Sequence, residues 1–219
     1  CGILLHPAGH TRSPAMHRAA YRERGLDATY VAFDVAPKLL GDALRGARAL
    51  GIRQLAVSLP HKVAVRKYLD RIDPVAQKIG AVNTIWFEKS GRMVGGNTDA
   101  YGFAANLDER LPGWADAEVA TVLGAGGASR AVIFALLKRG VKQVRVVNRT
   151  IERAEELAAR FGLPVRFLPV DPLEHGDAES EHSERPLPRA GWAESSTREK
   201  EREEQGHQSP DGWRTAHRG

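Results

Sequence analysis

A glycine-rich stretch, VLGAGGAS over residues 122–129, has the residue types and spacing that suit the binding of a phosphate group. Gly124 permits a tight turn, Gly126 lets a diphosphate approach the backbone, and Ser129 is small enough for close packing of a helix on a strand. A helix that starts near Gly127–Ala128 would turn its free N–H groups and the positive end of its dipole toward the phosphate. The alternative is a purely structural strand–turn–helix. The candidate binding residues of the turn are Gly124, Ala125, Gly126, Gly127 and Ala128.

The next expected strand ends 24 residues after Gly124, in the stretch VVNRT over residues 146–150. In NAD-binding folds an acidic residue at this place binds the ribose 2′-hydroxyl, and it would repel a 2′-phosphate. Asn148 and Arg149 remove that repulsion, and the guanidinium offers a planar, charged fork to a phosphate. A solvated Arg149 at a strand exit is the alternative. The pattern favours NADP, with the candidate binding residues Asn148, Arg149, Thr150 and Arg153.

Three histidines near the start of the chain, His6, His10 and His17, raise the question of a metal site. A proline and a glycine between the first two break any helical face, and no cysteine joins the set, so we predict no metal. His61 is expected at an outer rim rather than as a ligand.

Strands and helices alternate along the chain and must position these residues. Four expected strands and three expected helices precede residue 100: strands 1–5, 28–35, 54–59 and 84–89, and helices 13–25, 38–51 and 62–73. Ser13 is expected to cap the first helix. After the turn at Pro112-Gly113, a strand, a helix, a strand and a helix follow: 118–126, 128–140, 143–148 and 150–162. Strands separated by helices of this length indicate parallel βαβ units, so the expected fold class is α/β.

Composition excludes several classes of protein. A hydrophobic content of 42% is ordinary for a globular chain, and the single cysteine rules out a disulfide framework and fits a reducing cytosol. The longest apolar run, residues 131–137, is too short to span a bilayer, and no signal peptide is visible. We therefore expect a cytoplasmic protein with no membrane partner.

Residues 171–219 differ from the rest of the chain. They hold 12 acidic and seven basic residues and no Val, Ile, Phe or Met, whereas residues 1–170 hold 25 basic and 15 acidic residues. A segment so poor in apolar side chains cannot offset the entropy of ordering it, so we predict a disordered tail. The basic residues of residues 1–170 are scattered, so no nucleic-acid partner is predicted. The alternative is a nucleic-acid-binding protein. Its binding to DNA or RNA would be tight and would depend steeply on the salt concentration.

Four further stretches of the first half hold polar residues that a plain α/β domain does not need: HTRSP (10–14), VSLPHK (57–62), GAVNT (80–84) and GGNTDAYGF (95–103). With the glycine turn and NRT, this ordered set resembles the shikimate dehydrogenase family, from about residue 2 to about residue 167. The resemblance implies a substrate domain over residues 1–102, a partial Rossmann NADP-binding domain over 103–170, and reduction of 3-dehydroshikimate to shikimate with NADPH.

The resemblance also implies residue roles. Lys62 and Asp99 match the catalytic pair beside the carbonyl that becomes a hydroxyl, where the developing alkoxide needs a proton and a nearby positive charge. From the residues alone, Lys62 fits a solvated lysine in a first helical turn, and Asp99 fits a helix N-cap. Asn83 matches the asparagine that bonds substrate hydroxyls; its alternative is a turn residue.

Thr11 and Ser13 match the paired hydroxyls that hold the substrate carboxylate, and Ser58 matches a threonine that faces the substrate. Thr11 replaces the more usual serine, and Ala56 stands where an asparagine is common. These departures leave the choice between shikimate and quinate open.

The largest departure follows Pro169, where the family continues with further strands, a loop near the nicotinamide and a C-terminal helix. We expect a truncated family member with an unrelated tail over residues 171–219, low stability, weak cofactor binding and little or no activity. The alternatives are an inactive remnant that retains at most nucleotide binding and a quinate/shikimate variant. The expected partner is the small-molecule substrate, and both a monomer and a homodimer remain open.

Overall fold

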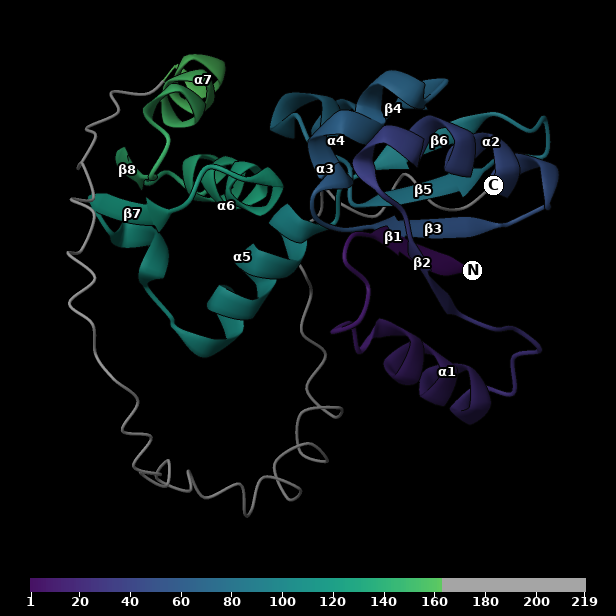
Figure 1. The fold of residues 1–219 in the computed structure, drawn as a ribbon. Coiled ribbons are helices and arrows are strands. Elements are labelled where there is room, and N and C mark those ends of the chain that lie inside the picture. Colours follow the sequence, from purple (N-terminus) through teal and green to yellow (C-terminus); the bar gives the residue numbers. More distant parts are fainter. Residues whose placement is uncertain (163–219) are drawn as a thin grey trace, which may run out of the picture. The chain divides into compact units, whose positions relative to one another are not determined.

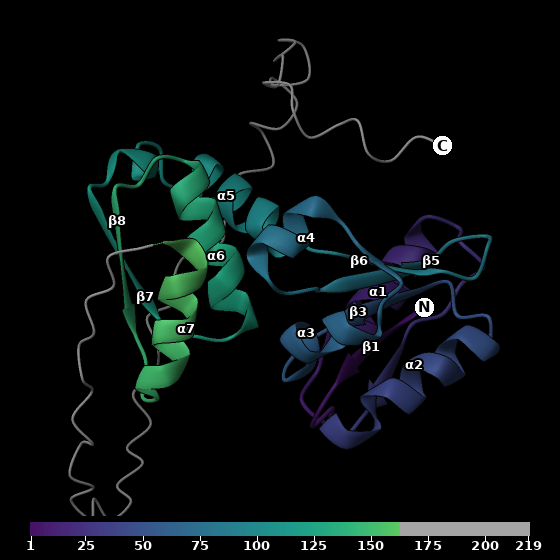
Figure 2. The same cartoon turned by 90° about the horizontal axis from the view of Figure 1, so that it is seen from above.

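A computed structural model describes residues 1–162, which form an α/β structure with two β-sheets (Figure 1, Figure 2). The predicted α/β fold class is confirmed. The tail predicted to be disordered, residues 171–219, lies outside the described residues. Within residues 1–162, no helix has the length and apolar character needed to cross a bilayer.

The first sheet has six strands in the order β2-β1-β3-β5-β6-β4. Its strands are β1 (Gly2–Leu5), β2 (Val31–Asp34), β3 (Gln54–Val57), β4 (Arg71–Ile72), β5 (Thr84–Phe87) and β6 (Met93–Gly96). Its helices are α1 (Ser13–Glu23), η1 (Pro37–Leu39), α2 (Leu40–Ala49), α3 (His61–Ala64), η2 (Val65–Tyr68) and α4 (Pro74–Ile79).

The two faces of this sheet are covered by different helices, with α1 on one side and α2 on the other (Figure 1). Side chains alternate along β1, because successive residues of a strand point to opposite faces. Ile3 and Leu5 pack in one cluster with Tyr30, whereas Leu4 packs in the larger cluster that contains Leu44 of α2. The sheet therefore has an apolar core on each face.

The prediction of parallel strands is correct for β1 with β2 and with β3, but wrong for β5. This strand runs antiparallel to both of its neighbours, β3 and β6. The register pairs Thr84, the first residue of β5, with Ala56 near the end of β3 and with Gly96 at the end of β6. Segments that follow β3, precede β5 and follow β6 therefore meet at one edge of the sheet.

The helix predicted over residues 62–73 is wrong in its second half. The chain becomes extended at Leu69 and enters β4, and the backbone N–H and side chain of Asp70 both bond to Met93 in the sheet. A separate helix, α4, then begins after Asp73, whose carboxylate accepts the Ala76 N–H at 2.7 Å. This cap satisfies one of the free donors of the first helical turn.

The second sheet consists of β7 (Val119–Leu123) and β8 (Gln143–Val147), which are parallel. The helices α6 (Gly127–Lys138) and α7 (Ile151–Phe161) lie on the same face of it (Figure 2). Val144 and Val146 of β8 pack there with Ile133 and Leu157, all four fully buried.

The helix α5 (Asp99–Arg110) links the two parts and is followed by η3 (Trp114–Asp116). A third apolar cluster contains four alanines from α5 and α6, with Ile79 and Ala81 from the first part: Ala100, Ala104, Ala131 and Ala135. These short side chains allow α5 and α6 to pack closely. The domain boundary predicted between residues 102 and 103 falls within α5 and stays a prediction.

Candidate active site

The structure brings Lys62, Asp99 and Asn83 together. The Lys62 Nζ lies 2.6 Å from Asp99 Oδ2, and Asn83 Nδ2 donates to Asp99 Oδ1 at 2.7 Å. The Lys62 and Asp99 side chains are 19% and 30% exposed, so the ion pair is largely shielded from solvent but still reachable. A charge-assisted hydrogen bond in such a place is stronger than one on an open surface.

The antiparallel placement of β5 explains this convergence. Lys62 follows β3, Asn83 directly precedes β5, and Asp99 follows β6, so all three start from the same edge of the sheet. Backbone bonds fix the arrangement: Val82 N–H donates to Lys62 O at 2.8 Å, and Asn83 N–H donates to Gly96 O at 3.0 Å.

Asn97 is a functional candidate that the sequence did not single out. Its side chain is 9% exposed, its Nδ2 donates to Ala81 O at 3.0 Å, and its Oδ1 accepts the Asp99 N–H at 2.9 Å. The Asn97 amide thus ties the first residue of α5 to the segment before β5. The stretch GGNTDAYGF contained this residue, but only the fold gives it a partner. Thr98, not Asp99, occupies the N-cap position of α5.

The prediction that His61 lies at an outer rim is wrong. The ring is 1% exposed, and its Nε2 is 2.8 Å from Val35 O, which can only accept. Burial lowers the pKa of His61, and the hydrogen bond to Val35 partly opposes that effect. The side chain is a core residue that anchors α3 directly before Lys62.

The three remaining substrate candidates lie in two places. Ser58 lines the same cavity as Lys62, whereas Thr11 and Ser13 are not among the residues that line it in the described part of the chain. Thr11 Oγ1 accepts the Ser13 N–H at 3.3 Å. The prediction that Ser13 caps α1 is wrong, since α1 begins at Ser13 and Arg12 holds the N-cap position.

The glycine turn has the predicted geometry. Gly124 has a φ of +96°, which favours glycine, and its N–H donates to Val147 O at 2.7 Å. The helix α6 begins at Gly127, as predicted. A Cβ added at Gly126 would meet nothing within 4 Å, so the backbone there is open to a ligand, whereas one added at Gly127 would lie 2.7 Å from the Lys62 Cβ.

The glycine turn and Lys62 line one cavity of about 560 Å³. Its walls are built by the β3–α3 turn, the glycine turn and the facing side of α7, with the lining residues Ser58, Leu59, Pro60, Lys62, Val63, Ala125, Gly126, Gly127, Ala128, Arg130, Arg153 and Glu156. Open backbone at Gly126, a helix N-terminus and several cations are the features that a dinucleotide diphosphate requires. The residues present therefore fit such a cofactor.

Arg130 and Glu156 are cavity residues that the sequence did not single out. Arg130 is 4% exposed, and its Nη2 donates to Glu156 Oε1 at 2.7 Å. This bond and the charge of Arg130 lower the pKa of the Glu156 carboxyl, so it is ionised near neutral pH. The pair joins α6 to α7 beside Arg153. Its two members lie 26 positions apart in the chain, so no local spacing revealed it.

The residues of NRT form a short connection between β8 and α7. The Asn148 side chain donates to Thr150 O at 2.7 Å and closes this connection, while Arg149 is exposed. Arg153 follows on α7 and lines the cavity. Of the two predicted phosphate-binding cations, the structure therefore places Arg153 at the cavity wall and Arg149 on the exposed connection before it.

Two of the three histidines considered for a metal site have other contacts. His6 Nδ1 lies 2.7 Å from Asp34 Oδ1, and His17 stacks on Tyr30 with ring centroids 4.0 Å apart. Among residues 1–162, no group of three or more His, Cys, Asp or Glu side chains is placed to hold a metal ion.

Two family models match the chain. The shikimate dehydrogenase substrate-binding domain matches residues 3–85, and the shikimate/quinate 5-dehydrogenase model matches residues 107–181.

Curated relatives named shikimate dehydrogenase (NADP(+)) include a Mesorhizobium japonicum protein, 51% identical over 163 residues, and a Brucella ovis protein, 53% identical over 159 residues. The alignments cover 74% and 73% of this chain, and 58% and 55% of those proteins. The chain thus matches little more than half the length of these relatives.

Solved structures agree with this relationship. The Aquifex aeolicus shikimate dehydrogenase superposes with a TM-score of 0.70 at 40% identity, covering 76% of this chain and 61% of that one. The Thermus thermophilus shikimate 5-dehydrogenase, solved with NADP(H) and shikimate, gives 0.67 at 43% identity and covers 77% and 62%. By sequence and by fold, the chain belongs to the shikimate dehydrogenase family.

Proposed function

We propose that this chain acts, with the low turnover expected from its sequence, as an NADPH-dependent oxidoreductase that reduces 3-dehydroshikimate to shikimate. The observation that carries the proposal is the Lys62–Asp99 ion pair, at 2.6 Å, with Lys62 in the wall of the cavity that the glycine turn also lines. A carbonyl reduction needs a proton donor close to the cofactor, and this arrangement supplies one.

Lys62 is assigned the proton transfer. When bound, NADPH supplies the hydride that the carbonyl carbon accepts. The Lys62 ammonium then faces the oxygen on which negative charge develops, stabilises that charge and donates a proton to it. Asp99 holds the ammonium in place through Oδ2. The Asn83 Nδ2 donates to Asp99 Oδ1 and Thr98 Oγ1, and its Oδ1 accepts the Thr98 N–H. Asn83 is assigned to a substrate hydroxyl that donates to the free lone pair of Oδ1.

The remaining polar candidates are assigned to binding. Ser58 lies in the cavity wall beside Lys62 and is assigned to the substrate ring. Thr11 and Ser13 are assigned to the substrate carboxylate, as the family resemblance implies. Their hydroxyls are small donors that fix orientation without adding charge.

The cofactor assignment rests on the charges around the turn. The open backbone at Gly126 and the start of α6 are assigned to the diphosphate. Arg153 and Arg149 are assigned to the 2′-phosphate, because no acidic side chain stands at the end of β8 to repel it. NADPH is therefore preferred over NADH in this proposal.

The test is the oxidation of NADPH by the purified chain, followed at 340 nm, with and without 3-dehydroshikimate. Lys62→Met keeps much of the side-chain length but removes the proton donor, so turnover should fall by about 10²–10⁴-fold. Lys142→Met is the matched control, because Lys142 pairs with Glu118 on the surface, outside the cavity. Oxidation independent of 3-dehydroshikimate, or unchanged by Lys62→Met, would overturn the proposal. A parallel assay with quinate and NADP⁺ decides between the two polyol acids.

A further inference from the structure

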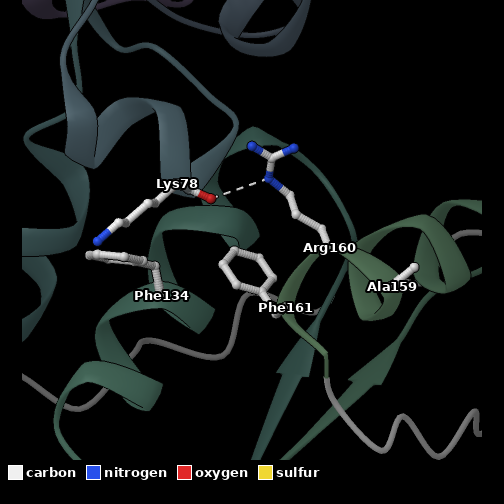
Figure 3. A pocket seen from close by; sticks show the side chains of 5 residues that line it. All are labelled: Lys78, Phe134, Ala159, Arg160 and Phe161. Atoms are coloured by element: carbon white, nitrogen blue, oxygen red, sulfur yellow. Dashed lines mark hydrogen bonds between the residues drawn. The ribbon is translucent and has the colours of Figure 1, made fainter.

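The last turn of α4 is held by a side chain from the other sheet's helix α7. Arg160 donates from Nη2 to Gln77 O at 2.6 Å, and from Nε to Lys78 O at 3.3 Å and to Ile79 O at 3.2 Å. Figure 3 shows the guanidinium reaching from α7 toward the Lys78 carbonyl, above the ring of Phe161. Carbonyls at a helix C-terminus lack partners within the helix, and a cation suits their partial negative charge.

Gly80 makes room for this contact. It follows α4 with a φ of +76°, in the left-handed region that favours glycine. A Cβ added there would overlap the Nε and Cζ atoms of Arg160. The guanidinium therefore occupies the space in which any other residue at position 80 would place its side chain. The backbone conformation favours glycine here, and any other side chain would have to displace the guanidinium.

The segment directly after Gly80 leads to the proposed catalytic residues. Ala81 O accepts Asn97 Nδ2 at 3.0 Å, and Val82 N–H donates to Lys62 O at 2.8 Å. Asn83, the next residue, bonds to Asp99 through its side chain at 2.7 Å. Only two residues, Ala81 and Val82, thus lie between Gly80, which the guanidinium approaches, and Asn83, which bonds to Asp99.

The helix that carries Arg160 also carries Arg153 of the cavity wall. Between them, Ala154 and Leu157 are fully buried and fix α7 to the second sheet. The helix thus carries two arginines, and its buried centre keeps Arg153 in place whether or not Arg160 is bonded to α4. Arg153 lines the cavity proposed for the cofactor. Arg160 bonds to the end of α4, which leads directly into residues 81–83 beside the proposed substrate site.

We propose that Arg160 is a positioning residue for the reaction. It fastens α7 to the end of α4 and thereby holds residues 81–83 where they support Lys62 and Asp99. The inference rests on the proposed function for its kinetic consequence, but the mechanical part concerns the chain itself. No atom of Arg160 is assigned to substrate or cofactor.

Arg160→Met removes the three hydrogen bonds and keeps the aliphatic stem. Misplacement of catalytic groups by a fraction of an ångström should lower kcat/KM by about ten- to a hundredfold. NADPH affinity should change little, because Arg153 and the glycine turn are untouched. The matched control is Arg139→Met at the end of α6, which removes a surface ion pair with Asp108 and should leave kcat/KM unchanged.

A double-mutant cycle tests the contact itself. Gly80→Ala should displace the guanidinium and lower kcat/KM as Arg160→Met does. In the Arg160→Met background no guanidinium remains to be displaced, so Gly80→Ala should lower kcat/KM further only through the backbone strain of an alanine at a positive φ. Non-additivity supports the contact. Fully additive losses, or Arg160→Met that lowers only the melting temperature while kcat/KM stays unchanged, would overturn the proposal.

Amide hydrogen exchange separates this inference from the proposed function. In Arg160→Met, without any ligand, the amides of Val82 and Asn83 should exchange about tenfold faster, because the bonds they make to Lys62 and Gly96 are less supported. That increase in a chain without turnover would sink the proposed function and leave the mechanical role intact. Unchanged exchange at these amides would refute the role of Arg160, whatever the activity.

Discussion

Asp99→Asn is the substitution that probes the centre of the site most selectively. The carboxylate accepts two donors, Lys62 Nζ on Oδ2 at 2.6 Å and Asn83 Nδ2 on Oδ1 at 2.7 Å. An asparagine of the same size has only one oxygen, so its NH₂ group must face one of the two donors. In either orientation Lys62 loses its charged partner, whereas the Asn83 amide keeps two bonds to Thr98.

The expected cost differs between folding and catalysis. Losing one hydrogen bond to a charged group at a partly exposed pair should lower the free energy of unfolding by about 1–2 kcal/mol. Losing an oriented proton donor should lower kcat/KM by about 10²–10⁴-fold, which corresponds to about 2.7–5.4 kcal/mol of transition-state stabilisation. The catalytic loss should therefore exceed the loss of stability.

The assay combines 3-dehydroshikimate-dependent NADPH oxidation with urea unfolding. Asp108→Asn is the matched control, because Asp108 also accepts two side-chain donors, Trp114 Nε1 at 3.0 Å and Arg139. The Asp108→Asn variant should lose a comparable free energy of unfolding but keep the turnover of the unsubstituted chain. A kcat/KM of Asp99→Asn within roughly threefold of the unsubstituted chain, or an equal loss of activity in Asp108→Asn, would refute the role assigned to Asp99.

Three further substitutions test other parts of the account. Arg149→Asp places an acid at the end of β8, so NADPH should bind about ten- to a hundredfold more weakly and NADH no worse, as measured by fluorescence titration. Gly127→Ala adds a Cβ 2.7 Å from that of Lys62 and should lower kcat/KM about tenfold or more, whereas Gly102→Ala, with nothing within 4 Å, should not. Burial lowers the pKa of His61, so below about pH 6.5 the unfolded chain takes up a proton there more readily than the native chain does. Stability should fall as the pH drops through that value, and thermal midpoints of His61→Gln at pH 5.5 and 7.5 should differ less than those of the unsubstituted chain.

Local signals were sufficient to predict the local structure of the proposed nucleotide-binding half of the site. The turn at Gly124 and the start of α6 at Gly127 depend on backbone conformation and helix-forming residues within a few positions. The strand predicted over residues 143–148 likewise indicated that Asn148 and Arg149 would stand at the end of β8. These features agree with the structure because neighbouring residues determine them.

Features set by distant residues were not predicted. Nothing within Thr84–Phe87 shows that this strand runs antiparallel to β3 and β6, although that direction brings Asn83 to Asp99. The His61 ring can be buried because the Val35 carbonyl, directly after β2, accepts a hydrogen bond from its Nε2. The helix α4 did have a local signal, since Asp73-Pro74 is a typical start and Gly80 a typical end.

The most direct measurement is a crystal structure of the chain with NADP⁺ and shikimate bound. The substrate hydroxyl that arises from the carbonyl should lie within about 2.6–3.2 Å of Lys62 Nζ. The diphosphate should lie at the start of α6, and the 2′-phosphate should lie beside Arg149 and Arg153. Shikimate bound away from Lys62, or a diphosphate away from the glycine turn, would contradict the proposed function.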